Sequence, residues 1–144
     1  MFKVGIIGAG WIAGKMAEAL APLEDYCVYA IASRSIGKAT EFAGRWNIPK
    51  AYGSYEDMVK DNDVDLVYIA TPHSHHFPHA MLALDAGKPV LVEKAFTANA
   101  AEAEELIETA RSKGLFITEA IWTRYMPLSH KVKEIMESGI IGKP

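Results

Sequence analysis

A pair of charged residues, Glu93 and Lys94, directly follows the apolar run of residues 89–92. Charged side chains are rarely placed at the end of a buried strand without a reason, so this pair is a candidate for chemistry. A partly buried lysine has a lowered pKa and can accept or donate a proton near neutral pH, so Lys94 is the predicted acid/base. Because successive side chains of a strand point to opposite sides, we expect Glu93 to orient a cofactor or a loop.

Four histidines are clustered in residues 73–79, directly after another apolar run. We expect these histidines to face one crevice, with His73 and His76 lining a ligand pocket, although His79 could lie on the surface of a helix. His75 and His79 are four residues apart and could bind a metal ion from one helix face. The segment contains neither a cysteine nor an acidic residue, which argues against a metal site, and no metal ligand is predicted.

The start of the chain predicts the element that positions these groups. Residues 4–7 are mostly apolar and β-branched, as in a strand buried on both faces, and residues 11–21 favour a helix. Between them, Gly8, Gly10 and Ala13 match the spacing of a dinucleotide-binding turn. The first glycine allows the bend, the second lets a pyrophosphate approach, and the small third residue lets the helix lie close to the strand.

The amides of the first helical turn and the positive end of the helix dipole then face the phosphates. The predicted phosphate-binding residues are Gly8, Ala9, Gly10, Trp11, Ile12 and Ala13. The alternative is an ordinary tight connection between a strand and a helix. A preceding strand, a following helix and a continuing alternation of strands and helices favour the nucleotide site.

This alternation predicts an α/β fold, a doubly wound parallel sheet of the Rossmann type with strand order 3-2-1-4-5-6. We expect further strands at 27–32, 51–52, 65–70, 89–92 and 115–118, and further helices at 36–46, from 54, 74–86, 100–113 and 128–138. Ser54 and Asn99 are predicted helix N-caps. The carboxyl ends of parallel strands share one edge, so the polar residues at the strand ends are expected to form one site.

The end of the second predicted strand indicates which dinucleotide is bound. NAD-binding sites usually present a carboxylate there to the ribose hydroxyls. This chain has Ser33, Arg34 and Ser35, with Lys38 one turn further on. A guanidinium can bind a 2′-phosphate through two parallel hydrogen bonds, so NADP is the favoured cofactor, with NAD as the alternative. A solvated loop arginine would leave this choice open.

Aromatic residues follow the last predicted strand. Trp122, Arg124 and Tyr125 lie where a ligand would bind, and we expect Trp122 and Arg124 to contact the cofactor or the substrate. The alternative is a rim of packing aromatic side chains with a solvated arginine. The side chains of Trp11 and Trp46 are interpreted as packing residues.

Length and composition restrict the class of protein. The 144 residues are expected to form one domain, 1–144. A net charge of −3 indicates neither nucleic acid nor an anionic membrane as a partner. Cys27 is the only cysteine, so no internal disulfide forms, and because the first strand begins almost at Met1 we expect no signal peptide. We expect a cytoplasmic protein.

The motifs Gly8–Gly10, Ala70–Pro72, Glu93–Lys94 and Trp122–Pro127 together resemble the glucose–fructose oxidoreductase/inositol dehydrogenase family. Residues 119–127 look particularly like the dihydrodiol dehydrogenase and sugar dehydrogenase members. The resemblance implies an NAD(P)-dependent oxidoreductase that acts on a CH–OH group of a sugar, cyclitol or other diol. It places the family's catalytic lysine on Lys94, its phosphate-binding turn on Gly8, Gly10 and Ala13, and its cofactor contact on Thr71 and Pro72.

The chain departs from this family in two ways. The Glu-Lys-Pro motif of the family here ends in Ala95, which implies a looser backbone around the lysine. Family members also carry a second, C-terminal domain that supplies most of the substrate pocket and the contact between subunits. We therefore expect this chain to be the N-terminal part of a longer, homo-oligomeric enzyme. By itself, the chain is expected to bind cofactor but to turn over substrate poorly. The rivals are a module that senses a dinucleotide without chemistry and a histidine-rich metal hydrolase.

Overall fold

The computed structural model describes residues 1–142 of the chain. Its strands are β1 (Phe2–Ile7), β2 (Tyr26–Ala32), β3 (Lys50–Tyr52), β4 (Leu66–Ile69), β5 (Val90–Val92) and β6 (Ile117–Glu119). They form a single sheet in the order β3-β2-β1-β4-β5-β6, and every neighbouring pair is parallel. The predicted fold class and strand order are confirmed.

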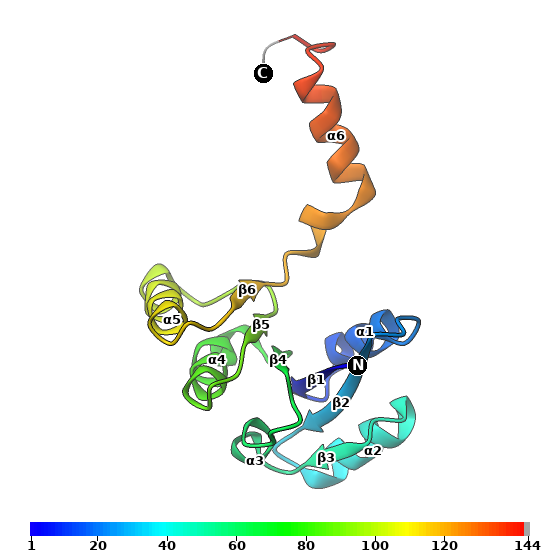
Figure 1. Ribbon diagram of the computed structural model, residues 1–144, viewed down its shortest axis with the longest axis vertical. Helices are drawn as coiled ribbons and strands as arrows, with labels where there is room; N and C mark the ends of the chain where they lie inside the picture. Colours follow the sequence, from blue (N-terminus) through cyan, green and yellow to red (C-terminus); the bar gives the residue numbers. More distant parts are fainter. Residues whose placement is uncertain (143–144) are drawn as a thin grey trace.

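The helices are α1 (Trp11–Leu20), α2 (Ile36–Trp46), α3 (Tyr55–Val59), α4 (His76–Asp85), α5 (Ala100–Ser112) and α6 (Pro127–Glu137). Two 3-10 turns, η1 (His73–His75) and η2 (Trp122–Tyr125), precede α4 and α6. In Figure 1, α1 and α2 lie on one face of the sheet, and α3, α4 and α5 lie on the other. Among the described helices, none is both long enough and apolar enough to cross a bilayer.

The core lies on both faces of the sheet. Ile6 packs with Ala13 and Phe42 toward α1 and α2, whereas Ile7 packs with Leu84 and Leu106 toward α4 and α5. Ile6 and Ile7 are both fully buried, so β1 is covered on both sides as predicted. The start of α1 is thereby held at a fixed place above the centre of the sheet.

The predicted caps are present. The Ser54 hydroxyl accepts a hydrogen bond from the Asp57 amide, and the Asn99 side chain accepts one from the Glu102 amide. The Glu102 carboxylate in turn accepts a hydrogen bond from the Ala98 amide. Helices α3 and α5 therefore begin where the sequence predicts.

Most boundaries lie within one or two residues of the prediction, and two of the shifts have a clear cause in the hydrogen bonds. Instead of one helix over 74–86, hydrogen bonds three residues apart, such as that from the His75 amide to the Pro72 carbonyl, form η1 before α4. The last strand begins at Ile117, because the Leu115 amide still donates to the Ala110 carbonyl at the end of α5. These shifts place His76 at the first position of α4.

The amino-terminal edge of the sheet carries a charged network centred on Asp61. Its carboxylate accepts hydrogen bonds from the Lys50 ammonium, the Tyr52 hydroxyl and the Asp63 amide at 2.9, 2.7 and 3.0 Å. Burial alone would raise the pKa of Asp61, but the hydrogen bonds from Tyr52 and Lys50 outweigh it and lower the pKa to about 2. The network thus ties the loop before β4 to β3.

Replacement of Asp61 by asparagine should lower the free energy of unfolding by about 1.5–3 kcal/mol at neutral pH. Because the folded pKa lies below the unfolded value of 3.8, the carboxylate stabilises the fold above that pH, and its contribution is lost as the pH falls through about 2. Urea unfolding at several pH values should show the difference from the native chain shrinking with acidity. Glu18→Gln, which breaks the exposed ion pair with Lys15, is the control, with an effect below about 1 kcal/mol. A difference independent of pH would contradict the assignment.

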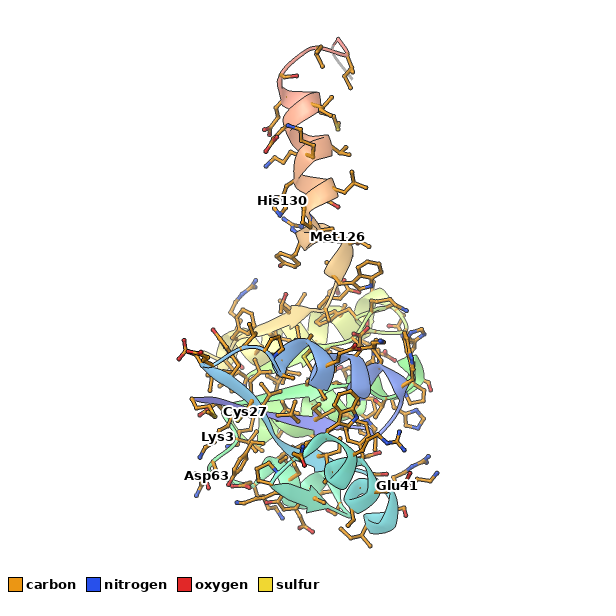
Figure 2. The ribbon with its side chains drawn as sticks, turned by 90° about the vertical axis from the view of Figure 1, so that its right-hand side faces the viewer. Lys3, Cys27, Glu41, Asp63, Met126 and His130 are labelled. Carbon is orange, nitrogen blue, oxygen red and sulfur yellow. The ribbon has the colours of Figure 1, made fainter. Side chains whose placement is uncertain are left out.

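Helix α6 differs from the other helices because it projects away from the sheet, beyond η2 (Figure 1). None of its residues is buried, and Leu128, Val132 and Met136 are exposed. Figure 2 shows Met126 at the base of this projecting helix and His130 further along it, away from the body of the fold.

Candidate functional site

A cavity of about 990 Å³ lies over β4, β5 and β6, on the face of the sheet that α1 and α2 cover only in part. Its walls come from α1, from the segments that follow β4, β5 and β6, and from the sheet itself. The lining residues that bear polar or aromatic groups are Trp11, Lys15, Tyr68, Thr71, His73, His76, Glu93, Lys94, Phe116, Thr118, Glu119, Trp122 and Tyr125. One end of the cavity, at Thr71 and Lys94, therefore reaches the carboxyl edge of the sheet where the sequence predicts a ligand site.

The glycine bend has the geometry of a phosphate-binding turn. Gly8 has a φ of +103°, and a Cβ there would lie 2.8 Å from the Ala70 carbonyl oxygen, so only glycine fits. Gly10 is the N-cap of α1, and a Cβ there would meet no atom within 4 Å. Ala13 is fully buried, so α1 lies close to the sheet. The open space at Gly10, beside the unpaired amides of the first turn, fits a bound pyrophosphate.

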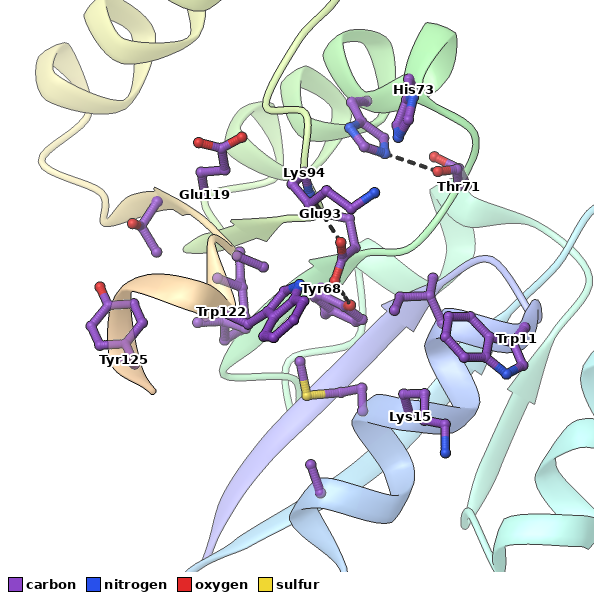
Figure 3. Close-up of a pocket in the computed structure, with 18 of the residues that line it drawn as sticks. Trp11, Lys15, Tyr68, Thr71, His73, Glu93, Lys94, Glu119, Trp122 and Tyr125 are labelled. Carbon is purple, nitrogen blue, oxygen red and sulfur yellow. Dashed lines mark hydrogen bonds between the residues drawn. The ribbon is translucent and has the colours of Figure 1, made fainter. Parts of the chain in front are cut away.

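Lys94 and Glu93 lie in the same cavity as the first turn of α1, and Trp11 stands across from them (Figure 3). The buried Glu93 carboxylate accepts hydrogen bonds from the Tyr68 hydroxyl and from the Lys94 amide. Burial and the neighbouring Glu93 raise the pKa of Tyr68 well above its usual range, so Tyr68 keeps its proton. The Lys94 side chain is exposed, so the expectation of a partly buried ammonium is wrong for the chain by itself.

Hydrogen bonds from side chains fix the backbone after Lys94, where the peptide bond to Ala95 is cis. The Ala95 carbonyl lies 2.7 Å from Nδ1 of His76, and the Phe96 amide donates to the Glu119 carboxylate at 2.8 Å. Together with the hydrogen bond from the Lys94 amide to the Glu93 carboxylate, these contacts fix the backbone of the three consecutive residues 94–96. The looser backbone implied by Ala95 is therefore offset by contacts from α4 and β6.

The histidines divide into two groups, which corrects the prediction that all four face the crevice. His73 and His76 line the cavity, but His76 is fully buried and its Nε2 lies 2.8 Å from the Thr71 carbonyl, so it joins two loops. His75 and His79 lie outside the cavity lining. His79 is half-buried against Tyr55, so the alternative of a place on the helix surface does not hold. Within residues 1–142, no group of three or more potential ligand side chains could hold a metal ion.

The predicted 2′-phosphate residues lie at the carboxyl end of β2 and the start of α2. Arg34, Ser35 and Lys38 are exposed, whereas Ser33 is buried and its hydroxyl accepts a weak hydrogen bond from the Ser35 amide at 3.4 Å. None of them lines the cavity, nor does Pro72. Arg34, Ser35 and Lys38 are accessible to a ligand that would extend from the cavity past Gly10 toward β2.

The predicted aromatic residues after β6 differ in where they lie. Trp122 and Tyr125 line the cavity, but Arg124 does not, so the structure does not bring Arg124 to the site. Trp46 packs on Phe42, with 6.4 Å between the ring centroids, as expected. Trp11 is 76% exposed, which corrects its assignment as a packing residue.

Tyr68 and Glu119 line the cavity but are not among the predicted site residues. Tyr68 lies within an apolar strand, where a hydroxyl is the one polar group that needs a partner, and that partner is Glu93. Glu119 ends β6 and holds the Phe96 amide. The position of Glu119 at a strand end was a usable signal, whereas the contact of Tyr68 with Glu93 depends on the register between β4 and β5.

Comparison with known proteins identifies similar sequences. The family described as "Oxidoreductase family, NAD-binding Rossmann fold" matches residues 2–120. The chain is 46% identical over 140 residues to trans-1,2-dihydrobenzene-1,2-diol dehydrogenase of Mus musculus, covering 96% of this chain and 42% of that protein. It is 56% identical over 119 residues to D-xylose 1-dehydrogenase (NADP(+)) of Hypocrea jecorina, covering 80% of this chain and 30% of that protein.

Solved structures are similar to this chain over nearly its whole length. A 3-ketoreductase from Actinomadura kijaniata, in complex with NADP, superposes with a TM-score of 0.91 at 34% identity, covering 98% of this chain and 45% of that one. An NAD-binding oxidoreductase from Klebsiella pneumoniae has a TM-score of 0.86 at 31% identity, covering 99% of this chain and 40% of that one. The chain thus spans less than half the length of each of these relatives.

Proposed function

Because the chain belongs to the oxidoreductase family with the NAD-binding Rossmann fold, we propose that it is the cofactor-binding part of an NADP-dependent dehydrogenase or reductase. The observation that carries this proposal is the shared cavity of Lys94 and the first turn of α1. One wall offers amides to a pyrophosphate, and the other offers the Lys94 amino group, which accepts the hydroxyl proton as a neutral amine and donates a proton to the carbonyl oxygen as an ammonium. The reaction is hydride transfer between the nicotinamide and a CH–OH carbon.

In this mechanism the bound nicotinamide supplies the site that accepts or gives up the hydride. The amides at the start of α1 bind the pyrophosphate and fix the depth of the cofactor in the cavity. Lys94 Nζ takes the hydroxyl proton during oxidation and returns it during reduction. Glu93 holds the Lys94 amide, and its bond to Tyr68 keeps the carboxylate in place. The exposed ammonium loses water contacts when cofactor and substrate fill the cavity.

The substrate class is proposed from chemistry and from the relatives together. Names of two relatives state a cyclic diol and a sugar, D-xylose, as substrates. We propose that a sugar, cyclitol or other diol binds between Lys94 and the aromatic side chains of Trp122 and Tyr125. Residues 1–144 supply one side of that pocket, so we expect this chain alone to bind cofactor and to turn over poorly. The homo-oligomer and the cytoplasmic location remain predictions.

The preference for NADP rests on Arg34, and calorimetric titration with NADPH and NADH tests it. Arg34→Ala should weaken NADPH binding by about 10- to 100-fold, because charge-assisted hydrogen bonds to the 2′-phosphate are lost. The dissociation constant for NADH should stay within about twofold. Support for this choice comes from the relatives that are named as using or containing NADP.

Arg111→Ala provides the matched control, since Arg111 is an exposed arginine in the last turn of α5, on the opposite face of the sheet. It should leave both affinities unchanged. Equal losses of NADPH and NADH affinity in Arg34→Ala would contradict the 2′-phosphate assignment. A native chain that binds neither nucleotide would end the whole proposal.

A further inference from the structure

Thr71 follows β4 and lines the cavity, and three neighbours fix its position. Its methyl carbon lies against the glycine bend, 3.1 Å from the place a Cβ on Gly8 would occupy. Its carbonyl oxygen lies 2.8 Å from Nε2 of His76, and its hydroxyl oxygen lies 3.0 Å from Nδ1 of His79. Main chain and side chain of Thr71 are therefore held by different histidines of α4.

The side-chain contact decides which way Thr71 presents its hydroxyl. A threonine side chain has staggered rotamers that exchange the positions of its methyl and hydroxyl groups. In the observed rotamer the methyl group faces Gly8 and the hydroxyl faces His79. Without a polar partner at residue 79, nothing on α4 would favour this rotamer over the others. The wall of the cavity beside the phosphate turn would then lose a fixed polar group.

The His79 ring is itself well placed for this role. It packs edge-on against Tyr55, with 4.7 Å between ring centroids, and lies 5.6 Å from the His75 ring. Burial, assisted by His75, lowers the pKa of His79, so the ring is neutral near pH 7. A neutral ring can accept a hydrogen bond from the Thr71 hydroxyl at Nδ1, which leaves the lone pairs of the Thr71 oxygen to accept from a donor group of the dinucleotide, a ribose hydroxyl or the carboxamide N–H.

We propose that His79 is a positioning residue for the dinucleotide: it orients the Thr71 hydroxyl beside the phosphate turn and acts on cofactor affinity through that hydroxyl. This inference rests on the proposed function. It assigns to His79 neither contact with the cofactor nor metal binding, since the side chain lies outside the cavity lining.

A double-mutant cycle on the dissociation constant of NADPH tests this role. His79→Phe keeps an aromatic ring against Tyr55 but removes the nitrogen, and Thr71→Val keeps the shape but removes the hydroxyl. Each single change should raise the dissociation constant by about 3- to 10-fold, the effect of one hydrogen bond. The double variant should bind no more weakly than Thr71→Val, because His79 acts only through the hydroxyl.

Conservative variants separate positioning from a structural role. His79→Asn places an amide group near the former Nδ1 and should recover most of the affinity, although it removes the ring from Tyr55. The amide of His79→Gln reaches further, to the position of Nε2, so its NADPH affinity should be as low as that of His79→Phe. His79→Gln also serves in place of His79→Phe if the latter does not fold. Thr71→Ser should bind nearly as the native chain does.

The outcomes distinguish this inference from the proposed function. If the native chain binds neither NADPH nor NADH, the proposed function fails. If the native chain binds NADPH and His79→Phe and His79→Gln bind it equally well, the proposed function stands and the role of His79 is refuted. Effects of His79→Phe and Thr71→Val that multiply in the double variant would also refute it, since His79 would then act by another route.

Discussion

Lys94→Met should reduce hydride transfer by about 10²- to 10⁴-fold in the full-length protein that contains residues 1–144. Methionine has a similar length but neither holds nor releases a proton, so the substrate hydroxyl loses its acid/base partner. Cofactor affinity should stay within about twofold, because the phosphate turn of α1 is unchanged. Steady-state turnover and a separate calorimetric titration of the cofactor measure these quantities.

The control is Lys60→Met, which changes an exposed lysine at the end of α3, on the opposite face of the sheet. Its turnover should equal that of the native protein. Added methylamine should restore part of the turnover of Lys94→Ala, since a free amine can enter the space and carry the proton. Full turnover in Lys94→Met would remove the acid/base assignment. Binding without turnover in the native full-length protein would favour the sensing module.

Gly8→Ala and Gly10→Ala should have opposite consequences, although the two glycines are separated by one residue. At Gly8 the backbone has a φ of +103° and the new methyl group would lie 2.8 Å from the Ala70 carbonyl oxygen. Strain and overlap together should lower the free energy of unfolding by about 2–5 kcal/mol. Thermal or urea unfolding of the chain without ligand measures this loss.

At Gly10 the same methyl group meets open space, so the unfolding free energy should change by less than about 0.5 kcal/mol. The methyl group would instead occupy the place where a pyrophosphate approaches, and cofactor binding should weaken at least about tenfold. Normal NADPH affinity in a folded Gly10→Ala chain would contradict the placement of the phosphates. A fully stable Gly8→Ala chain would contradict the geometry of the bend.

The sheet order could be predicted because local patterns determine it. The apolar run ending at Ile7, the caps Ser54 and Asn99 and the glycine bend each depend on residues close in the chain. A parallel sheet with right-handed connections then leaves few arrangements. Boundaries were less accurate where hydrogen bonds outside the regular pattern decide them, as at η1 and at Leu115.

The sequence predicts the site only as the polar residues that follow the ends of several strands. Its contacts depend on which side chains meet across the sheet: Tyr68 reaches Glu93 because β4 and β5 pair in a particular register. The roles of His76 and His79 differ although both lie on α4, because one is turned under the loop after β5 and the other toward Tyr55. Arg124 was misplaced because Trp122 and Tyr125 of the η2 turn line the cavity, whereas Arg124, between them, does not.

The positions of the indole rings allow cofactor binding to be followed by the intrinsic tryptophan fluorescence of the chain. Trp11 and Trp122 border the cavity and are 76% and 58% exposed, whereas Trp46 lies against Gly14 and Phe42. Indole emission overlaps the absorption band of a reduced nicotinamide. A reduced nicotinamide bound in this cavity would therefore quench the emission of both exposed indoles and fluoresce by energy transfer, without any added dye.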